Sequence, residues 1–463
     1  MELQLRISGL HNETLKQHLL PADGREAVAV ALCGRFSDSE SEYLLVHDLT
    51  LIPYNECFSR ESDILHWSTQ RIQHYFERIG KSDLALLKIH SHPNGYDKFS
   101  STDDFSDIEF FNSAFGWAIN DKPHASAVML PEGKIFGRFF FNDLHHEPID
   151  KILVAGDTIQ QYSNSKQFSI ADFALRTIQA FGEQTYHRLS QMTVGIVGCS
   201  GTGSPVIEQL TRLGIGKLVV IDPDIVEEKN LNRILNTTMS DVKTLKPKVV
   251  VISDVIKKIG LGTDVDSHQV NLYDDVEAIK ALIKCDAVFG CMDTVDGRHL
   301  LNQLCSFYLL PYFDLGVKLE ANGIGGIDKI CGSVHYLQPC KSSLISRGVY
   351  TKEDLRASSQ FRRNPEEFEN LKKEKYIKNI NVDNPAVISV NMQIASHAVN
   401  EFLNRIHLYK TDPPSNYAAS TIDITEGYIV NTNELDFQTD HYLKKRSGRG
   451  DINPFIEMSE LVS

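Results

Sequence analysis

The alternation of short apolar strands with helices from Thr193 onward constrains the fold of this chain more than any other feature. A strand over Val194–Val197 runs into a glycine-rich turn, and a helix over Pro205–Leu213 follows. The same order returns in strand Leu218–Ile221, helix Pro247–Ile259, strand Ala287–Phe289 and helix Gly297–Leu309. Strands that alternate with helices of this length predict an α/β fold with a mostly parallel, doubly wound sheet.

The first 155 residues predict a separate α/β domain. Its expected elements are strands over Ala27–Leu32, Tyr43–Leu49 and Ala85–Ile89 and a helix over Asp63–Ile79. Residues 139–151 are polar and irregular and residues 168–189 have helical spacing, so we place the domain junction near residue 155. The second domain then spans residues 156–440, and residues 441–463 form a C-terminal tail.

One stretch inside the second domain has a different composition. Residues 341–384 are charged and poor in apolar side chains, whereas Ala386–Ile406 returns to an apolar helical pattern. We expect residues 341–384 to form a mobile crossover loop.

Composition excludes several classes of function. The net charge of −14 argues against a nucleic-acid partner, which would favour a basic face. No segment approaches the roughly 20 apolar residues that span a bilayer, and the first ten residues lack a signal-peptide pattern. The eight cysteines form no C-x-x-C pair, so we expect a cytoplasmic protein without membrane contact or a disulfide framework.

A histidine pair predicts a metal site in the first domain. His90 and His92 lie two residues apart on an extended segment, so both side chains point to one side. Asp103, eleven residues after the second histidine, can add a third ligand from the following turn. Three nitrogen and oxygen ligands with a fourth position left for water are typical of catalytic zinc. An H-x-H pair alone would be a chance pattern, but Pro93 and the Ser-x-x-Asp spacing favour the metal site.

Two more residues are candidates for the chemistry of this site. Glu26 precedes the apolar strand and could move a proton to or from the attacking water. Ser100 could donate a hydrogen bond to a developing oxyanion.

The stretch from His90 to Asp103 resembles the JAMM (Jab1/MPN) metalloprotease motif, H-S/T-H-P-x6-S-x-x-D, and matches it completely. The resemblance covers roughly residues 20–140. It implies that His90, His92 and Asp103 bind Zn²⁺, that Ser100 supports the oxyanion and that an upstream glutamate is the acid/base. We assign that role to Glu26, although acidic residues at Glu40, Glu42 and Glu56 are also nearby. The family cleaves peptide or isopeptide bonds after the C-terminus of ubiquitin or ubiquitin-like proteins.

The glycine-rich turn predicts a phosphate-binding loop in the second domain. Gly198, Gly201 and Gly203 lie between a strand and a helix, where backbone N–H groups and the helix N-terminus attract phosphate. Asp222 ends the next strand, about where an acidic residue binds ribose hydroxyls. These residues alone fit a Rossmann dehydrogenase equally well.

The residues further along the chain favour adenylation by ATP instead. Arg233 and Lys248 can bind the triphosphate as it is attacked, and Asp293 can hold Mg²⁺. Neutralising and positioning the phosphates supplies most of the catalysis in such transfers. A dehydrogenase has no need for these residues.

The run from Ile221 to Arg233, with Lys248 and Asp293, resembles the ThiF-type adenylyltransferases, which include ubiquitin-activating enzymes. The resemblance extends from about residue 170 to 430. It implies that Asp222 binds the ribose, that Asn230, Arg233 and Lys248 bind phosphates, and that Asp293 binds Mg²⁺. Arg176 resembles the arginine that reaches the γ-phosphate. The family also implies a homodimer.

The chain departs from this family at two points. Ser200 replaces the second glycine of the turn, which is tolerated if its φ stays negative, and the family's paired C-x-x-C zinc motifs are missing. Cys340, which opens the polar stretch, is the candidate for a thioester with the activated carboxylate. An ordinary thiol fits Cys340 equally well; Cys331 reads as a core residue and Cys199 lies too close to the phosphates.

Together the two resemblances imply ATP-dependent activation of the C-terminus of a ubiquitin-like protein and hydrolysis at that same C-terminus. Such fusions resemble those of bacterial ubiquitin-like conjugation systems, with a conjugating enzyme as a further partner and antiviral defence as a suggested setting. The alternative is activation of a sulfur carrier, with hydrolytic release of a product for cysteine or cofactor synthesis. A non-catalytic scaffold is disfavoured because both motif sets are complete.

Overall fold

The computed structural model describes residues 1–163, 170–322, 324–364, 386–458 and 461. The chain divides into two compact units. Unit 1 comprises Met1–Gln167, Ser306–Leu309 and Lys445–Val462, and unit 2 comprises Phe168–Cys305 and Leu310–Lys444 with Ser463.

Unit 1 is built on a nine-stranded mixed sheet with strand order β11-β10-β1-β3-β2-β6-β7-β8-β9. Its strands are β1 Glu2–Ser8, β2 Val28–Ser37, β3 Ser41–Leu51, β6 Ala85–Ser91, β7 His124–Met129, β8 Ile135–Phe140, β9 His146–Pro148, β10 Lys151–Ala155 and β11 Ile159–Ser163. A separate hairpin joins β4 Cys57–Arg60 and β5 Leu65–Trp67. The helices are α1 Gly9–Leu19, η1 Tyr54–Glu56, η2 Thr69–Ile72, α2 Gln73–Ile79, α3 Ser101–Trp117 and η7 Phe455–Glu457.

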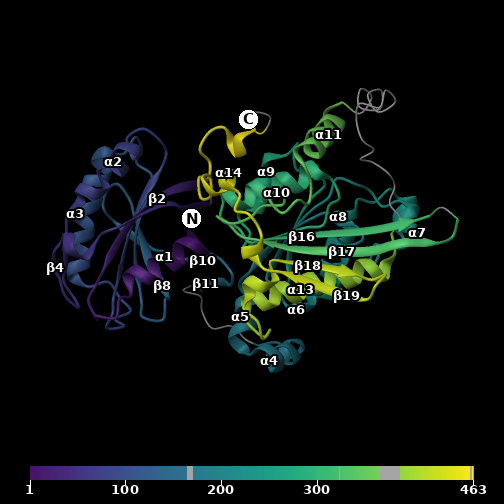
Figure 1. Ribbon diagram of the computed structural model, residues 1–463, viewed down its shortest axis with the longest axis horizontal. Coiled ribbons are helices and arrows are strands. Elements are labelled where there is room, and N and C mark those ends of the chain that lie inside the picture. Colours follow the sequence, from purple (N-terminus) through teal and green to yellow (C-terminus); the bar gives the residue numbers. More distant parts are fainter. Residues whose placement is uncertain (164–169, 323, 365–385, 459–460, 462–463) are drawn as a thin grey trace. The chain divides into compact units, whose positions relative to one another are not determined.

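The alternation of side chains along β2 creates two apolar layers, one on each face of the sheet. Ala29, Ala31 and Cys33 face a core that α1 covers, whereas Val30 and Leu32 face a core that α2 and α3 cover. Figure 1 shows α1 on one side of this sheet and α2 and α3 on the other. Apolar residues on both faces explain why β2 reads as an unbroken apolar run in the sequence.

The C-terminal segment of the chain is an integral part of unit 1. The amide of Gly34 donates to the carbonyl of Gly448 at 3.2 Å, and the amide of Asp451 donates to the carbonyl of Arg35 at 2.8 Å. A Cβ atom at Gly34 would overlap the backbone of Arg449 and Gly448. The segment expected as a tail from residue 441 therefore packs from Lys445 onward against β2.

Unit 2 is built on an eight-stranded sheet with strand order β14-β13-β12-β15-β16-β17-β18-β19. Its strands are β12 Thr193–Val197, β13 Lys217–Ile221, β14 Asp264–His268, β15 Ala287–Gly290, β16 Tyr312–Ala321, β17 Ile327–Leu337, β18 Ala419–Asp423 and β19 Tyr428–Thr432. The strands from β14 to β16 are parallel and the last three are antiparallel. The predicted mostly parallel α/β sheet is confirmed.

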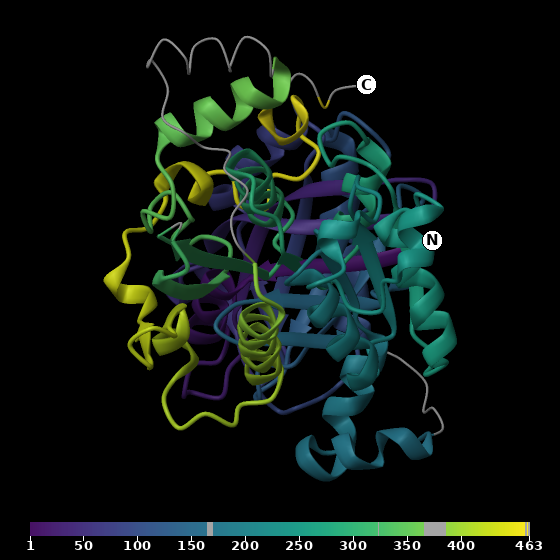
Figure 2. The same cartoon turned by 90° about the vertical axis from the view of Figure 1, so that its right-hand side faces the viewer.

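Helices cover both faces of this sheet. They are η3 Asp172–Ala174, α4 Leu175–Phe181, α5 Glu183–Gln191, α6 Gly203–Leu213, η4 Glu228–Asn230, α7 Met239–Lys243, α8 Lys248–Ile259, α9 Val276–Ile283, α10 Val295–Phe307, α11 Lys352–Arg363, α13 Ile388–Ile406, η5 Pro414–Tyr417, η6 Glu434–Asp436 and α14 His441–Lys444. Figure 1 shows α9 and α10 on one side of the sheet and α6 and α13 on the other. In Figure 2, α4 and α11 lie at opposite ends of unit 2.

Three sequence-based expectations about helices and loops are wrong or only partly tested. The helix expected over Asp63–Ile79 forms only as α2, because Leu65–Trp67 pairs with β4 and Ser68 caps η2. The helix expected over residues 168–189 is broken by Gly182, which has φ +80° and separates α4 from α5. Within the expected crossover loop, residues 352–363 are helix α11, and residues 365–385 lie outside the described residues.

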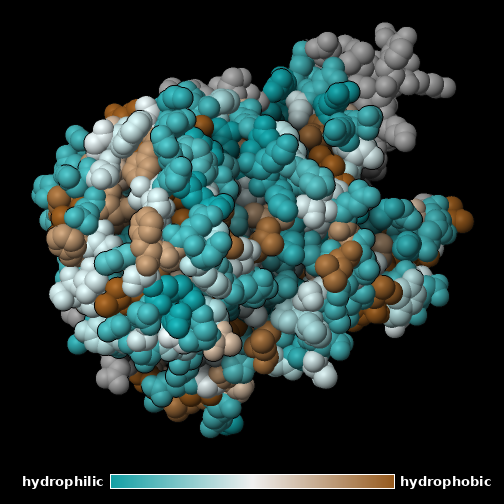
Figure 3. Space-filling view, turned by 60° about the vertical axis from the view of Figure 1, so that its left-hand side comes forward, coloured by the Kyte–Doolittle hydropathy of each residue, from teal (hydrophilic) through white to brown (hydrophobic). Residues whose placement is uncertain are grey.

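The surface is mixed in character. The face in Figure 3 is mainly hydrophilic, with apolar residues scattered among polar ones. Across the described ranges, no helix combines the length and the apolar character that a membrane crossing requires.

Candidate functional site

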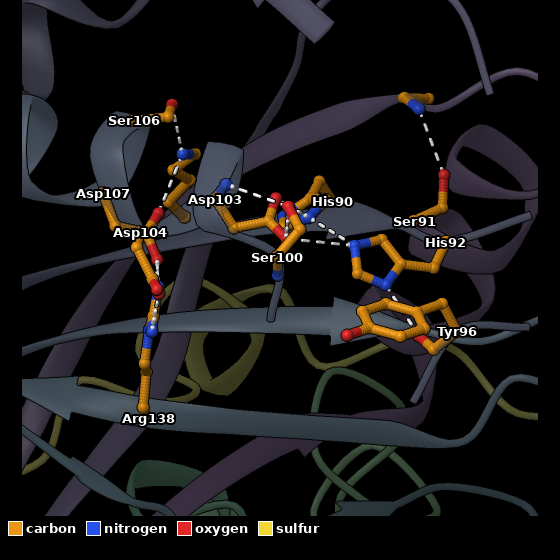
Figure 4. Close-up of polar contacts among 12 residues, drawn as sticks. His90, Ser91, His92, Tyr96, Ser100, Asp103, Asp104, Ser106, Asp107 and Arg138 are labelled. Carbon is orange, nitrogen blue, oxygen red and sulfur yellow. Dashed lines mark hydrogen bonds and ion pairs between the residues drawn. The ribbon is translucent and has the colours of Figure 1, made fainter. Parts of the chain in front are cut away.

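The candidate metal residues of unit 1 come from a strand end and a helix start. His90 is the next-to-last residue of β6, His92 follows it, and Asp103 lies in the first turn of α3. All three side chains are buried or nearly so, and Figure 4 shows them converging on one point. Among the described residues they are the one group of three or more histidine, cysteine or acidic side chains whose ligand atoms cluster, within 4.8 Å of one another.

The distances between these side chains suit a tetrahedral metal ion. The Nε2 atoms of His90 and His92 are 3.1 Å apart. Two nitrogens each about 2.0 Å from a tetrahedral ion would lie roughly 3.3 Å apart. The oxygens of Asp103 lie 3.0 Å from Nε2 of His90 and 3.4 Å from Nε2 of His92. The donor set and its spacing therefore fit zinc.

The outer contacts of His92 present the correct nitrogen to a metal. Its Nδ1 lies 2.7 Å from the carbonyl oxygen of Tyr96, which accepts a hydrogen bond only from a protonated Nδ1. In the neutral ring, Nε2 then carries the lone pair, as in zinc sites where the second nitrogen is held by a carbonyl. Burial lowers the pKa of His92, but Asp103 and the Tyr96 carbonyl raise it more.

Ser100 fixes the position of Asp103. Its hydroxyl donates to Oδ2 of Asp103 at 2.7 Å and accepts from the Asp103 amide at 3.1 Å. This capping box starts α3, and the same carboxylate accepts from the amide of Ser100. The predicted role of Ser100 at an oxyanion stays a prediction, because here its hydroxyl hydrogen is directed to Asp103.

Glu26 is the glutamate that the structure places beside the histidines. It lies two residues before Val28, the first residue of β2, which pairs with His90, and it is 6% exposed. Burial raises its pKa to about 7, with opposing charge effects from His92 and Asp103. The other candidates are engaged elsewhere: Glu42 with Arg35, Glu56 with Arg71, and Glu40 in the turn after Asp38.

A buried ion cluster behind the metal residues was missed by the sequence reasoning. The Nζ of Lys88 and Nη2 of Arg138 each lie 2.8 Å from the carboxylate of Asp107, which is fully buried. Lys88 shares one face of β6 with His90, and Asp107 lies one helical turn after Asp103. The sequence did contain a signal for this cluster: Lys88 is two residues before His90 on a strand, and Asp107 is four residues after Asp103 on a helix, so each pair shares one face of its element.

The glycine turn of unit 2 is shaped by close backbone approaches. Gly198 has φ +95°, and a Cβ atom there would come within 2.6 Å of the Cys291 carbonyl oxygen. A Cβ at Gly203 would overlap the Gly198 carbonyl, and one at Gly201 would overlap the amide of Asn391. Ser200 is not among the described residues with positive φ, so it fits the turn.

Asp222 and Lys248 meet directly beside this turn. One carboxylate oxygen of Asp222 accepts from the Cys199 amide at 2.7 Å. The Nζ of Lys248 lies 2.6 Å from Asp224 and 3.4 Å from Asp222. Burial lowers the pKa of Lys248, but the two carboxylates outweigh it and the pKa is raised. The structure thus brings these predicted residues together at the carboxyl ends of β12 and β13.

Arg233 also approaches the turn. Its Cδ would lie 3.3 Å from a Cβ at Gly201, and its guanidinium donates to the Lys229 carbonyl. Asn230 is buried and its side-chain oxygen accepts from the Glu227 amide, which holds η4 in place. Asn391, on α13, faces Gly201 and is 5% exposed. Sequence reasoning assigned no role to Asn391 although it lies in a matching stretch.

Three further predicted residues are not brought to the turn by a described contact. Asp293 is exposed in the loop after β15, and Arg176 is exposed on α4, which packs against α5. Cys340 is 5% exposed with φ +70°, so it lies buried where a mobile position was expected. Cys331 is half-buried on β17 and Cys199 is buried in the turn.

A strand, a glycine turn and a helix, with a buried acidic residue after the next strand, define a nucleotide-binding α/β domain. Residues 174–434 match the family model described as the ThiF family. The match spans more than half of the chain, and the chain belongs to the ThiF family.

Known proteins resemble parts of this chain. Ubiquitin-like modifier-activating enzyme 5 of Dictyostelium discoideum is 30% identical over 169 residues, which are 34% of this chain and 42% of that protein. SAMP-activating enzyme E1 of Haloferax volcanii is 34% identical over 131 residues, which are 28% of this chain and 47% of that protein. The chain thus spans less than half the length of these relatives. The E. coli MccB structure with succinimide aligns with a TM-score of 0.44 and 18% identity, over 59% of this chain and 74% of that one.

Proposed function

We propose that unit 2 uses ATP to adenylate the C-terminal carboxylate of a ubiquitin-like protein. The observation that carries this proposal is the buried Lys248, held by Asp222 and Asp224 beside a glycine turn. A cation fixed there can offset phosphate charge without reorganising. Relatives named as ubiquitin-like modifier- and SAMP-activating enzymes support the substrate class.

Each side chain has a defined task in this reaction. The turn amides and the N-terminus of α6 bind phosphate oxygens, Arg233 and Lys248 offset their charge, and Asn230 contributes a polar contact. Asp222 binds the ribose and Asp293 would hold Mg²⁺, which neutralises phosphate charge when bound. A carboxylate oxygen of the modifier attacks the α-phosphorus, the bond to the β-phosphate bridging oxygen breaks, and pyrophosphate leaves.

Modifier-dependent exchange between ATP and pyrophosphate tests this function. Wild-type protein should catalyse the exchange only when a ubiquitin-like protein is present, and Asp293→Ala should abolish it. Exchange that persists unchanged in Asp293→Ala would remove that residue from the mechanism. Absence of exchange with every candidate modifier would contradict the adenylation proposal itself.

The adenylate needs an acceptor. We infer transfer to the cysteine of a conjugating enzyme, either directly or through Cys340, whose buried thiol would have to become exposed first. We also infer a homodimer, in which the exposed Arg176 reaches the γ-phosphate of a bound nucleotide.

We propose that unit 1 is a zinc hydrolase that acts on the same C-terminus. His90, His92 and Asp103 would hold the ion, and their converging buried nitrogens and oxygens support this. Zinc lowers the pKa of a bound water and polarises a carbonyl when present. Glu26 accepts the proton of the attacking water and passes it to the leaving nitrogen. For Ser100 to donate to the oxyanion, its hydroxyl hydrogen would have to turn away from Asp103.

Zinc analysis of the purified protein tests the metal site. Wild-type protein should contain about one zinc per chain and His92→Ala should contain far less, with His74→Ala, an exposed histidine, as the control. Equal zinc in wild type and His92→Ala would overturn the site.

A second candidate is activation of a sulfur carrier, with hydrolytic release of a product from its end. The name SAMP-activating enzyme of one relative leaves both fates of the adenylate open. Identifying whether a conjugating enzyme or a cysteine- or cofactor-forming enzyme accepts the activated protein separates the two.

A further inference from the structure

A pocket of about 580 Å³ lies in unit 1 beside the candidate metal residues. It is lined by β8 and β9 at one edge of the curled sheet and by β10 and β11 at the other. The hydroxyl of Tyr162 on β11 donates to the carbonyl of Gly133 at 3.2 Å, which ties the two edges together. Pockets of this volume hold ligands of drug size, such as one to three amino-acid residues.

The pocket shares a wall with the metal residues. The ring of Phe136 lines the pocket and lies 6.5 Å from the His92 ring, edge-on. The rings of Phe99 and Phe136 meet edge to face, with their centroids 5.3 Å apart. The guanidinium carbon of Arg138 lies 3.8 Å from the centroid of the Phe99 ring. Asp104, another lining residue, directly follows Asp103 in the chain. The part of the pocket at Phe136 is therefore one side chain away from His92.

The lining combines an apolar floor with a cationic rim. Ile135, Ile149 and Ile152 are the buried side chains of this floor, and they belong to the core on the α1 face of the sheet. Lys98 and Lys134 are exposed on the rim, and no ion pair involving either is found among the described residues. Asp97 is the one rim carboxylate left over, because Asp104 is paired with Arg138. The rim thus has a surplus of positive charge.

We propose that this pocket binds the leaving group of the hydrolysis: a short C-terminal peptide or amino acid with an apolar side chain and a free carboxylate. The apolar side chain contacts the isoleucine floor, and the carboxylate lies at Lys98 and Lys134. This inference rests on the proposed hydrolase function of unit 1. It makes that hydrolase a trimming enzyme for a precursor C-terminus, because a lysine side chain on a folded target brings no carboxylate into the pocket.

The reaction balances as an ordinary hydrolysis. Water adds across the amide, the carbonyl carbon gains the oxygen, and the C–N bond breaks. The leaving nitrogen takes the proton and departs as the amine of the released residue. No other reactant is required.

Binding of a product analogue tests the pocket without relying on activity. Isothermal titration calorimetry on the full-length protein should show N-acetyl-leucine binding at least tenfold tighter than N-acetyl-leucinamide. Lys98→Glu/Lys134→Glu should erase this preference, and Lys81→Glu, another exposed lysine of unit 1, should keep it. Equal binding of acid and amide by wild-type protein would overturn the proposal.

Hydrolysis of model peptides separates this inference from the hydrolase proposal. Zinc-loaded protein should cleave acyl-Gly-Gly-Leu faster than its C-terminal amide and faster than acyl-Gly-Gly joined to a lysine side chain, with the difference in KM. Faster cleavage of the lysine-linked peptide would overturn the leaving-group assignment and keep the hydrolase. A protein that holds no zinc and cleaves none of the three would overturn the hydrolase, and the assignment with it.

Discussion

At the scale of single residues, the glycine turn shows how a missing side chain can be a requirement. Gly198, Gly201 and Gly203 each lie where a Cβ would meet another part of the chain: the Cys291 carbonyl, the Asn391 amide and the Gly198 carbonyl. The turn can be this tight only because three residues lack a Cβ. The proposed binding of phosphate by its amides depends on this tightness.

Gly203→Ala should therefore impair nucleotide binding. The added Cβ would overlap the Gly198 carbonyl and push the turn away from the N-terminus of α6. We expect at least a tenfold loss of affinity for a fluorescent ATP analogue. Gly116→Ala is a matched control, because no atom lies within 4 Å of its Cβ position in α3. Unchanged affinity in Gly203→Ala would show that the turn does not bind phosphate.

A buried histidine makes the stability of unit 2 depend on pH. Burial lowers the pKa of His335 to about 4, against about 6.5 in an unfolded chain. Below pH 6.5 this histidine is protonated in the unfolded state but stays neutral in the folded state. The free energy of unfolding therefore falls as the pH drops from about 6.5 to about 4. The full loss from this residue is about 3 kcal/mol.

In His335→Gln, the free energy of unfolding should fall less between pH 7 and pH 5 than in the wild type. Urea unfolding at the two pH values measures this difference. His441→Gln, at an exposed position of α14, serves as control and should follow the wild type. An equally steep fall in His335→Gln would exclude this histidine as a cause.

At the scale of elements, α3 and β6 are joined by charges rather than by apolar contacts alone. Lys88 on β6 and Arg138 on β8 both pair with the fully buried Asp107 of α3. The helix is thereby held so that Asp103 faces the two histidines (Figure 4). A buried charge that loses its partner costs more than the pair contributes.

Asp107→Ala should destabilise unit 1 by about 3–5 kcal/mol, because Lys88 would stay buried without its carboxylate and Arg138 would keep only the half-exposed Asp104. The midpoint temperature of thermal unfolding and the zinc content of the protein should both fall. Asp104→Ala is the comparison, since that side chain is half exposed and pairs with Arg138 alone. We expect it to cost less than about 1 kcal/mol. Similar losses in the two variants would contradict the ranking.

The sequence predicted local patterns better than long-range partners. The strands around the glycine turn and the spacing of His90, His92 and Asp103 depend on neighbours in the chain, so periodicity reveals them. The hairpin of β4 and β5 and the break at Gly182 depend on pairing and on backbone angles that periodicity does not record. Asn391 reaches Gly201 across almost 200 residues of sequence, and no local pattern marks such a contact.

At the scale of the whole molecule, unit 1 is discontinuous. Its sheet is formed by the first part of the chain, and Ser306–Leu309 and Lys445–Val462 complete the unit. Arg6 donates to the Tyr308 carbonyl at 3.2 Å, and the Tyr308 hydroxyl donates to Asp451 at 2.5 Å. These contacts make the C-terminal segment a structural part of unit 1.

Removing residues 445–463 should therefore destabilise unit 1 and spare unit 2. The truncated chain would lose the backbone bonds from Gly448 and Asp451 to β2. Hydrogen exchange should become faster in β2 and β3, and zinc content should fall, while ATP–pyrophosphate exchange is retained. Unchanged protection of β2 would show that the segment adds nothing to the fold.

Because the chain is synthesised from its N-terminus, the parts of unit 1 are made at different times. Strands β1 to β3 are synthesised almost 400 residues or more before Gly448 and Gly450, which lie against the carbonyl oxygens of Val46 and Arg35. The unit whose strands are made first is thus finished only after the segment from Lys445 onward is made, and a chain that stops before this segment carries an incomplete unit 1. Completion of unit 1 in this way depends on synthesis of the chain through at least Gly450.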